Sequence, residues 1–378
     1  MARVVVAADS FKGSLSSIEV ARSAAEGIRS VFPDCRVVET SVADGGEGSV
    51  AALVETLAGR VVEATVGDPL GRPVVASYGI VDGGRTAVIE MASASGLTLL
   101  DAEERNPMKS STFGTGELIA DALRRGCRKF LVCIGGSATN DAGTGMLRAL
   151  GYKFFDRYGR ELMGTGGELA AIASIDPSGA NTALSEADFR VACDVDTPFC
   201  GTNGAARIFA PQKGATPEMV EQLDQGLRNF AQVVRSFCGI DIASMPKAGA
   251  AGGLGGGFKA LLGATLLSGV DMVLDAIGFD QQIAGSDLII TGEGRLDSQT
   301  LTGKTPLGVL HRAQRQQIPV IAIGGSVEES ERLNEAGFTA IYPILPAPVT
   351  LSRAMDKSYA ADNVRRTVAQ IMRTIKTI

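Results

Sequence analysis

At 378 residues the chain is too long for one typical hydrophobic core, so we expect two domains. It has 45% hydrophobic and 21% charged residues and a net charge of −6, without any run of lysine or arginine, which argues against nucleic acid as a partner. No apolar run approaches the roughly 18 residues of a membrane span, and the first apolar run is broken too early for a signal peptide. We therefore expect a cytoplasmic protein with no membrane partner.

The chain opens with a β-α-β-α pattern. Residues 3–8 are almost entirely apolar, as in a parallel strand buried on both faces. Ser16 and Glu19 have the spacing of a capping box, which predicts a helix that runs to about residue 31. A strand over 36–42 and a helix over 49–57 follow, an order typical of a parallel sheet covered by helices.

The middle of the chain has a different pattern. Three strand-like segments in succession predict an antiparallel region and a domain boundary near residue 65. The elements expected here are strands over 61–66, 74–81, 86–91, 129–134 and 189–193, and helices over 113–125, from about 141, and over 217–237. A glycine tract at 249–257 is interpreted either as a flexible turn or as a tightly packed one.

The opening pattern returns in the last third. The expected strands cover 287–291, 319–323 and 338–344, and the expected helices cover 305–316, 328–336 and 358–375. We therefore expect one discontinuous α/β domain, residues 1–65 with 286–378, and a mixed α/β domain, residues 66–285, inserted into a surface loop of the first.

The reactive side chains available to this protein are limited. The six cysteines include no C-x-x-C pair, and we expect reduced thiols in the core. The single histidine, His311, lies in an amphipathic helical pattern, and we interpret it as structural. A histidine relay and a histidine metal site are therefore not expected, so the chemistry must depend on carboxylates, lysines and backbone groups.

Four glycine-rich loops that carry hydroxyl and carboxylate side chains follow predicted strands. Because ligands of parallel α/β sheets bind beyond the carboxyl ends of the strands, these loops are the candidate site. They cover residues 9–14, 44–48, 135–141 and 291–297.

Two nucleotide motifs are incomplete. Residues 298–305 end in Gly-Lys-Thr like a P-loop, but Ser298 stands where the first glycine is required and Pro306 follows directly. We therefore do not expect a P-loop, although Lys304 beside a helix N-terminus can bind an anion. No G-x-G-x-x-G motif follows the first strand, which argues against a dinucleotide site.

Asp194 and Asp196 directly follow the predicted strand over 189–193. Phosphoryl transfer needs a carboxylate to accept a proton from the hydroxyl group that receives the phosphoryl group, and it needs oxygen atoms to hold Mg²⁺. These two residues are therefore candidates for the base and for a metal ligand.

Eight short motifs carry a family resemblance, and the match runs from the first strand to beyond residue 345. They are Ala8-Asp9-Ser10-Phe11-Lys12, Ala43-Asp44-Gly45-Gly46-Glu47-Gly48, Ile89-Glu90-Met91-Ala92, Phe113-Gly114-Thr115-Gly116-Glu117, Ile134-Gly135-Gly136-Ser137-Ala138-Thr139, Cys193-Asp194-Val195-Asp196, Pro211-Gln212-Lys213-Gly214-Ala215 and Thr291-Gly292-Glu293-Gly294-Arg295. Together they resemble the bacterial glycerate 2-kinases, the type I glycerate kinase family.

The resemblance implies a reaction in which ATP phosphorylates D-glycerate to give 2-phospho-D-glycerate and ADP, with ATP and Mg²⁺ as cofactors. It also implies a two-domain α/β fold, in which a discontinuous Rossmann-like parallel-sheet domain carries an inserted mixed α/β domain and the active site lies in the interdomain cleft. The expected partners are small molecules, and a homo-oligomer is left open.

We assign the candidate residues four roles on this basis. Lys12 neutralises charge on the transferred phosphoryl group, and Asp194 accepts the proton of the substrate hydroxyl. The expected substrate-binding residues are Asp9, Ser10, Asp44, Glu47 and Arg295, of which Arg295 pairs with the substrate carboxylate. The expected nucleotide-binding residues are Gly135, Gly136, Ser137, Thr139, Gln212, Lys213 and Lys304. The expected metal ligands are Asp196, Glu293 and Asp297.

Two alternatives belong to other functional classes. A non-catalytic two-domain protein that binds a small hydroxy acid would explain a cleft, but not the clustered carboxylates and lysine. A nicotinamide-dependent hydroxy-acid dehydrogenase would share the α/β fold, but the dinucleotide motif and a catalytic histidine are missing.

Overall fold

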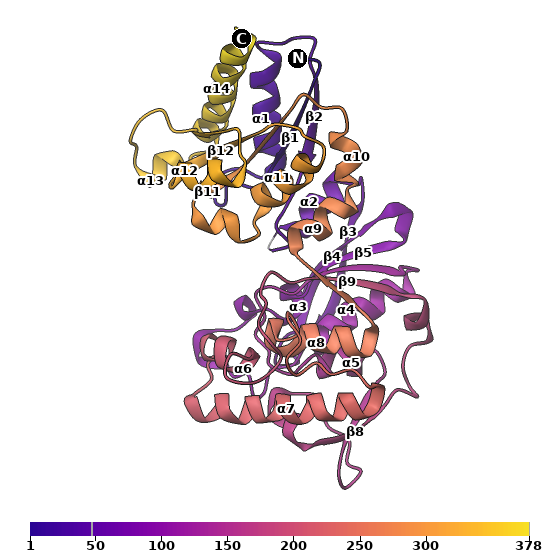
Figure 1. Ribbon diagram of the computed structural model, residues 1–378. Helices are drawn as coiled ribbons and strands as arrows, with labels where there is room; N and C mark the ends of the chain where they lie inside the picture. Colours follow the sequence, from indigo (N-terminus) through magenta and orange to yellow (C-terminus); the bar gives the residue numbers. More distant parts are fainter. Residues whose placement is uncertain (47, 378) are drawn as a thin grey trace. The chain divides into compact units, whose positions relative to one another are not determined.

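The structure is a computed structural model that describes residues 1–46 and 48–377 (Figure 1). The chain forms two compact units, residues 1–44 with 270–378 and residues 45–269. The first unit is therefore discontinuous in sequence, and the second unit is one continuous segment. Within the described residues, no helix is both long enough and apolar enough to span a membrane.

The first unit contains one parallel sheet made from both ends of the chain. Its strand order is β13-β12-β11-β1-β2. Strand β1 pairs with β11 in the register Val4 to Leu288, which joins segments more than 280 residues apart in sequence. The strands are β1 (Arg3–Ala8), β2 (Arg36–Ser41), β11 (Leu288–Leu296), β12 (Val320–Val327) and β13 (Ala340–Pro343).

Helices pack against this sheet. The helix α1 begins as the sequence predicts, since Ser16 and Glu19 form a reciprocal capping box. Helices α1 and α14 lie side by side (Figure 1), and a Cβ on Gly27 of α1 would lie 2.4 Å from the carbonyl oxygen of Arg365 of α14. The helices of this unit are α1 (Ser17–Arg29), α10 (Phe279–Ile283), α11 (Thr305–Arg315), α12 (Ser330–Ala336), α13 (Leu351–Ala354) and α14 (Lys357–Lys376), together with α9 (Gly269–Ala276), whose first residue belongs to the other unit.

The second unit contains a mixed sheet. Strands β3, β4 and β5 are antiparallel, as the sequence predicts, and the pairs β5-β6, β6-β9 and β9-β10 are parallel. The strands are β3 (Arg60–Gly67), β4 (Pro73–Val81), β5 (Thr86–Glu90), β6 (Lys129–Cys133), β9 (Asp188–Ala192) and β10 (Thr265–Leu267), and a separate hairpin consists of β7 (Lys153–Asp156) and β8 (Ile172–Asp176).

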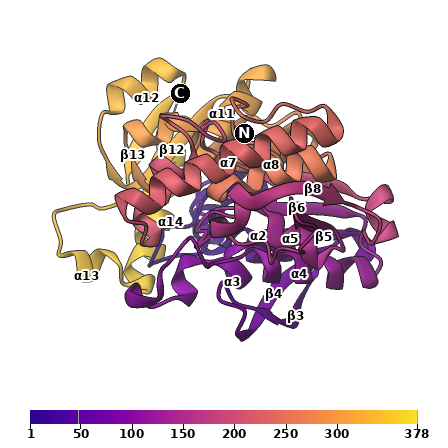
Figure 2. The same ribbon diagram turned by 90° about the horizontal axis from the view of Figure 1, so that it is seen from below.

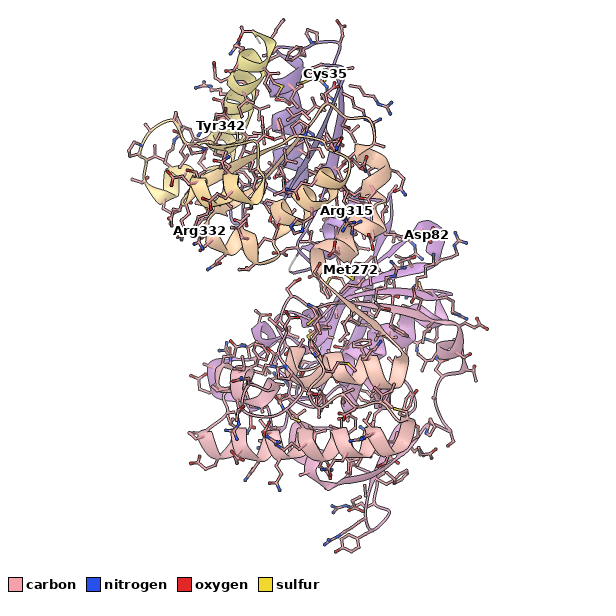
Figure 3. All side chains as sticks on the ribbon, viewed as in Figure 1. Cys35, Asp82, Met272, Arg315, Arg332 and Tyr342 are labelled. Atoms are coloured by element: carbon pink, nitrogen blue, oxygen red, sulfur yellow. The ribbon has the colours of Figure 1, made fainter. Side chains whose placement is uncertain are left out.

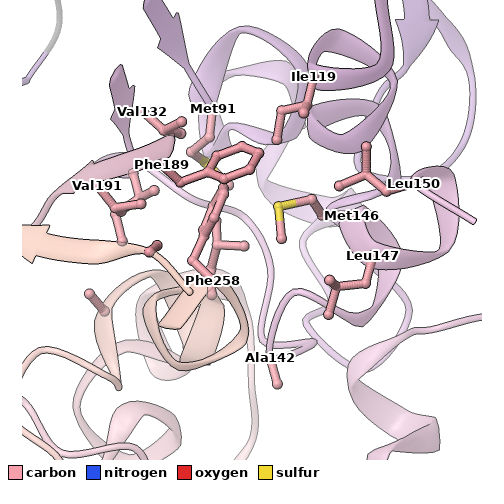
Figure 4. Close-up of a cluster of buried hydrophobic side chains, with 14 of the residues drawn as sticks. Met91, Ile119, Val132, Ala142, Met146, Leu147, Leu150, Phe189, Val191 and Phe258 are labelled. Carbon is pink, nitrogen blue, oxygen red and sulfur yellow. The ribbon is translucent and has the colours of Figure 1, made fainter. Parts of the chain in front are cut away.

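The core of the second unit lies between this sheet and its helices. Phe189 of β9 stacks on Phe130 of β6 and contacts Phe258, and Figure 4 shows Met146 and Ile119 pointing into the same cluster. Helices α7 and α8 run beside each other (Figure 2). The helices are α2 (Ser49–Thr56), α3 (Ala92–Ser95), α4 (Phe113–Arg124), α5 (Thr144–Ala149), α6 (Ala205–Phe209), α7 (Pro217–Cys238) and α8 (Ala250–Leu262).

The unit boundaries differ from the expected ones for two physical reasons. Strand β3 pairs with β4 along its whole length and α2 packs on β4, so residues 45–65 belong to the second unit and not to the first. At the other boundary, the buried guanidinium of Arg312 on α11 bonds Asp271, Asp275 and Asp280, which attaches α9 and α10 to the first unit.

The glycine tract at 249–257 is tightly packed, as in the second of the two interpretations, and most of it forms the first half of α8, which contains a non-helical turn at residues 251–253. Ala251, Gly252 and Gly253 have positive φ values. A Cβ on Gly252 would lie 2.1 Å from the carbonyl oxygen of Thr139, and one on Gly257 would lie 2.3 Å from that of Ala142. Only glycine allows α8 to approach the loop after β6 so closely.

Candidate active site

The carboxyl ends of β1, β2 and β11 meet at one edge of the first unit's sheet, where they surround a cavity of about 380 Å³. Seven of the predicted site residues line this cavity, as expected for loops that follow parallel strands. They are Asp9, Ser10, Lys12, Asp44, Glu293, Arg295 and Lys304. Glu47 lies outside the described residues.

Asp9 is a buried carboxylate of this cavity. It follows the last residue of β1 and is 7% exposed. Its carboxylate accepts hydrogen bonds from the backbone N–H of Ser10 at 2.6 Å and from the hydroxyl of Thr305 at 2.9 Å. Burial and the nearby negative charge of Asp44 raise the pKa of Asp9 to about 6. Asp9 is therefore poised to exchange a proton close to neutral pH.

Lys12 is the most accessible cation of the cavity. Its side chain is 74% exposed, and its Nζ lies 4.0 Å from a carboxylate oxygen of Asp44. An ion pair of this length on an exposed side chain is weak. Lys12 can therefore turn toward an anionic ligand at little energetic cost.

Glu293 and Lys304 form a second, more buried pair. The Nζ of Lys304 lies 3.2 Å from Glu293, whose other carboxylate oxygen accepts a hydrogen bond from the hydroxyl of Thr300 at 2.7 Å. Burial raises the pKa of Glu293. The segment before Lys304, residues 298–302, is a 3-10 turn, and this agrees with the absence of a P-loop.

Arg295 and Asp297 are held by each other and by neighbouring groups. Arg295 lies 2.9 Å from Asp297 and 2.9 Å from Glu328, and its side chain remains 59% exposed. Asp297 also caps the following 3-10 turn by accepting the N–H of Gln299. Arg295 lines the cavity, whereas the carboxylate of Asp297 already serves two structural partners.

The second unit contains predicted site residues in the loops after its adjacent parallel strands β6 and β9 and in the 3-10 turn at Pro211–Lys213. Gly135 and Gly136 are exposed, while Lys213 is only 2% exposed. The Nζ of Lys213 donates to the hydroxyl of Ser137 and to the carbonyl of Thr139, both at 2.6 Å. Burial lowers the pKa of Lys213 to about 7. Gln212, in the 3-10 turn that contains Lys213, is exposed.

Asp194 and Asp196 lie beyond the end of β9 and are both exposed. Asp194 accepts the backbone N–H of Gly269 at 2.8 Å. Asp196, with 81% of its side chain exposed, lies 3.2 Å from Lys247, which also donates to the carbonyl of Cys193. Both carboxylates therefore contribute to the structure of this loop.

Whether the predicted carboxylates can bind Mg²⁺ depends on how many of them lie close together. Within residues 1–46 and 48–377, no group of three or more acidic, histidine or cysteine side chains could hold a metal ion. Mg²⁺ normally binds through one or two carboxylates together with substrate phosphates. Glu293, Asp9 and Asp44 line one cavity and fit that mode, whereas Asp196 is in the other unit.

Sequence reasoning missed the two threonines that hold the buried carboxylates. Thr300 and Thr305 are fully buried and donate to Glu293 and Asp9, respectively. Both lie within residues 298–305, the segment that resembles a P-loop, but sequence reasoning could not identify their bonding partners, because Asp9 is distant in sequence and Glu293 lies across a turn. His311 is exposed on α11 and does not line the cavity.

A parallel α/β sheet whose carboxyl edge carries a cavity lined by lysines, arginine and carboxylates is typical of α/β proteins that bind small ligands at this edge. Comparison with known proteins gives the family. The model of the glycerate kinase family matches residues 4–376. The chain belongs to the glycerate kinase family, and it is accordingly an enzyme, a kinase.

Individual relatives support this assignment over nearly the whole chain. A glycerate kinase from Bacillus subtilis (strain 168) is 46% identical over 99% of this chain and 98% of its own length. A glycerate 2-kinase from Escherichia coli (strain K12) is 44% identical, with the same coverage. A crystal structure assigned as glycerate kinase 2 from Salmonella typhimurium LT2 is 43% identical, covers 100% of this chain and 98% of its own, and superposes with a TM-score of 0.91. The family therefore favours a kinase over both a non-catalytic binding protein and a dehydrogenase.

Proposed function

We propose that the protein transfers the γ-phosphoryl group of ATP to the 2-hydroxyl of D-glycerate, producing 2-phospho-D-glycerate and ADP. The observation that carries the proposal is the cavity at the carboxyl ends of β1, β2 and β11, where cations and carboxylates converge without a histidine. Phosphoryl transfer requires positioning and charge neutralisation more than covalent catalysis, so this set of groups suits it. The choice of the 2-hydroxyl is supported by the Escherichia coli relative, which is named a glycerate 2-kinase.

The cations Lys12 and Arg295 of the cavity have different proposed roles. Lys12, exposed and weakly paired, neutralises the charge that develops on the transferred phosphoryl group. Arg295, 59% exposed, pairs bidentately with the carboxylate of glycerate. Ser10 and Asp44 contribute polar contacts to the same substrate.

The carboxylates of the cavity provide oxygen ligands and a base. Glu293 and Asp297 would hold Mg²⁺ together with substrate phosphates. The ion would neutralise negative charge on the transferred phosphoryl group. For the base, the sequence favours Asp194, but the structure offers Asp9 as a second candidate. We favour Asp9, because its pKa is raised to about 6, whereas Asp194 is exposed and accepts a backbone hydrogen bond.

The loop after β6 in the second unit serves an anionic group of a substrate. Gly135 and Gly136 present exposed backbone, and Ser137, Thr139 and the buried Lys213 hold the shape of the loop. Such glycine-rich turns bind phosphate through backbone N–H groups. We retain the nucleotide phosphates as the ligand of this loop, with Gln212 beside it.

A product analysis tests the proposal directly. The purified protein is incubated with ATP, Mg²⁺ and D-glycerate, ADP is measured by a coupled assay, and the phosphorylated product is identified by ³¹P NMR. We expect ADP to appear only with D-glycerate present, in equal amount to 2-phosphoglycerate. Formation of 3-phosphoglycerate would contradict the proposed position of transfer, and ADP release without any phosphoglycerate would contradict glycerate as the acceptor.

A further inference from the structure

We infer that the cavity of the first unit binds the base and ribose of the nucleotide against an apolar wall made by the loop after β13 and by α13. This inference rests on the proposed use of ATP, and it assigns to the nucleoside a place that the sequence motifs did not indicate. The wall consists of Ile344, Leu345, Leu351, Ala354 and Met355.

The lining of the cavity has two chemically different parts. One part is the charged residues described above, and the other is the aliphatic and thioether side chains from residues 344–355. The two parts are joined where the side chain of Met355 lies over the loop after β1, since a Cβ on Gly13 would be 2.5 Å from its Cε. Phe11, from the same loop, also lines the cavity. A ligand that fills this space must therefore have a charged part and an apolar part.

The second substrate, glycerate, does not have these properties. Every carbon atom of this small hydroxy acid carries oxygen, so it gains nothing from an aliphatic wall. The cavity of about 380 Å³ falls in the range of roughly 300–1,000 Å³ that is typical of sites for larger ligands. A nucleotide has a flat base with apolar faces at one end and phosphates at the other, which matches the two chemically different parts of the cavity lining.

The apolar wall is also unusually open to solvent. Leu351 is 77% exposed and Met355 is 37% exposed. Tyr342 of β13 (Figure 3) is also 37% exposed, but it does not line the cavity. Exposed apolar side chains that gather at the mouth of a cavity mark a ligand-binding surface more often than isolated ones do. A bound base would cover Leu351 and Met355 and remove this surface from water.

The placement of the cations agrees with this orientation. Lys12 and Lys304 stand on the charged side, within the same cavity as the apolar wall. A nucleoside on residues 344–355 would direct its phosphates toward these two ammonium groups and toward Asp9, where transfer is proposed to occur. The inference thus leaves the proposed roles of Lys12 and Asp9 unchanged, and it assigns the nucleotide phosphates to Lys12 and Lys304 in place of the loop after β6.

Two variants with matched controls test the inference. Ala354→Phe fills the cavity, and Leu351→Asp places a charge on its most exposed apolar residue, where a folding defect is not expected. The controls are Ser352→Phe on the same helix and Val349→Asp in the preceding loop, because neither residue lines the cavity. We measure the KM for ATP and for D-glycerate, and the Kd of a non-hydrolysable ATP analogue by calorimetry.

We expect both test variants to raise the KM for ATP and the Kd of the analogue about tenfold or more, with a much smaller change in the KM for glycerate, and the controls to behave like the wild type. A larger effect on the KM for glycerate than on that for ATP, or no effect on either nucleotide constant, would overturn the inference. If the wild type bound the analogue but did not phosphorylate glycerate, the proposed function would fail, while the binding comparison would still decide the place of the nucleoside.

Discussion

At the scale of single residues, the environment of each carboxylate decides what it can do. Asp9 and Asp194 both follow the end of a strand, but Asp9 is buried beside another carboxylate and Asp194 is exposed. Burial and the negative charge of Asp44 raise the pKa of Asp9 to about 6, which is why we propose Asp9 as the base. The sequence had assigned the base to Asp194 and substrate binding to Asp9.

The assignment of the base predicts unequal effects for two isosteric variants. We expect Asp9→Asn to lower kcat by about 10²-fold or more, because the proton acceptor is lost, and Asp194→Asn to lower it less than about tenfold. Steady-state kinetics at saturating ATP and glycerate measure both values. The reverse order of effects would return the role to Asp194.

The hydroxyl of Thr305 is predicted to tune the pH dependence of the reaction. The base must be ionised to act, so kcat should rise with pH around the pKa of Asp9, about 6. A hydrogen bond to the ionised carboxylate lowers its pKa, so Thr305→Val should shift the rise in kcat to higher pH. Thr305→Ser keeps the hydroxyl and should restore the wild-type profile. A profile that does not move in Thr305→Val would show that this bond has no catalytic part.

Lys213 is predicted to make stability depend on pH. Because burial lowers its pKa to about 7, the unfolded chain binds a proton here that the folded chain has lost between about pH 7 and the ordinary lysine pKa. The contribution of Lys213 to stability should therefore increase as the pH rises from 7 toward 10. The urea midpoint of the wild type, relative to that of Lys213→Met, should increase over this range. A constant difference between the two proteins would contradict a low pKa for Lys213.

At the scale of elements, one buried arginine joins three helices of the first unit. Arg312 of α11 is 8% exposed in its side chain and bonds Asp271 and Asp275 of α9 and Asp280 of α10 at 2.8–3.0 Å. Without the guanidinium, three partly exposed carboxylates would remain close together. The same contacts explain why residues 270–285 belong to the first unit. The sequence pattern instead predicts them to be part of the inserted domain.

This ion-pair cluster is predicted to be important for stability. We expect Arg312→Met to lower the free energy of unfolding by about 2 kcal/mol, because removal of the guanidinium leaves the charges of three aspartates uncompensated. The loss of stability is smaller than for a fully buried ion pair, because the three aspartates are partly exposed to solvent. Arg315→Met, an exposed change on the same helix (Figure 3), serves as the control and should change stability by less than about 0.5 kcal/mol. Equal urea midpoints for the two variants would exclude a structural role for the cluster.

At the scale of the whole molecule, the first unit is built from two separate segments of the chain and the second unit from one continuous segment. The sheet of the first unit needs β1 and β11, which come from opposite ends of the chain. The second unit, residues 45–269, has its own sheet and its own continuous core. Contacts between segments distant in sequence therefore form the first unit, and a single uninterrupted segment forms the second.

This difference predicts that residues 45–269 fold as an isolated protein, because their core lies entirely within the segment. The excised segment should show native-like circular dichroism and a cooperative thermal transition. Residues 1–44 alone should show neither, because β1 would lack β11. A non-cooperative melt of the 45–269 segment, with binding of a hydrophobic dye, would mean that it depends on the rest of the chain.

Local signals in the sequence were sufficient for the elements and for many of the candidate residues. Apolar runs and the Ser16–Glu19 capping box predicted β1 and α1, and strand-following loops predicted that Asp9, Lys12 and Glu293 would lie at one sheet edge. These signals work because strand burial, helix capping and the carboxyl edge of a parallel sheet depend on residues close together in the chain.

Only the tertiary structure decided the properties that depend on distant residues. The bond from Thr305 to Asp9 spans 296 positions, the attachment of α9 and α10 depends on Arg312, and the apolar wall at residues 344–355 meets the charged loop after β1. Burial, pKa and the shape of a cavity arise from what packs around a group in space. The sequence by itself therefore determined the kind of chemistry available, and the fold decided which carboxylates are buried and which side chains line the cavity.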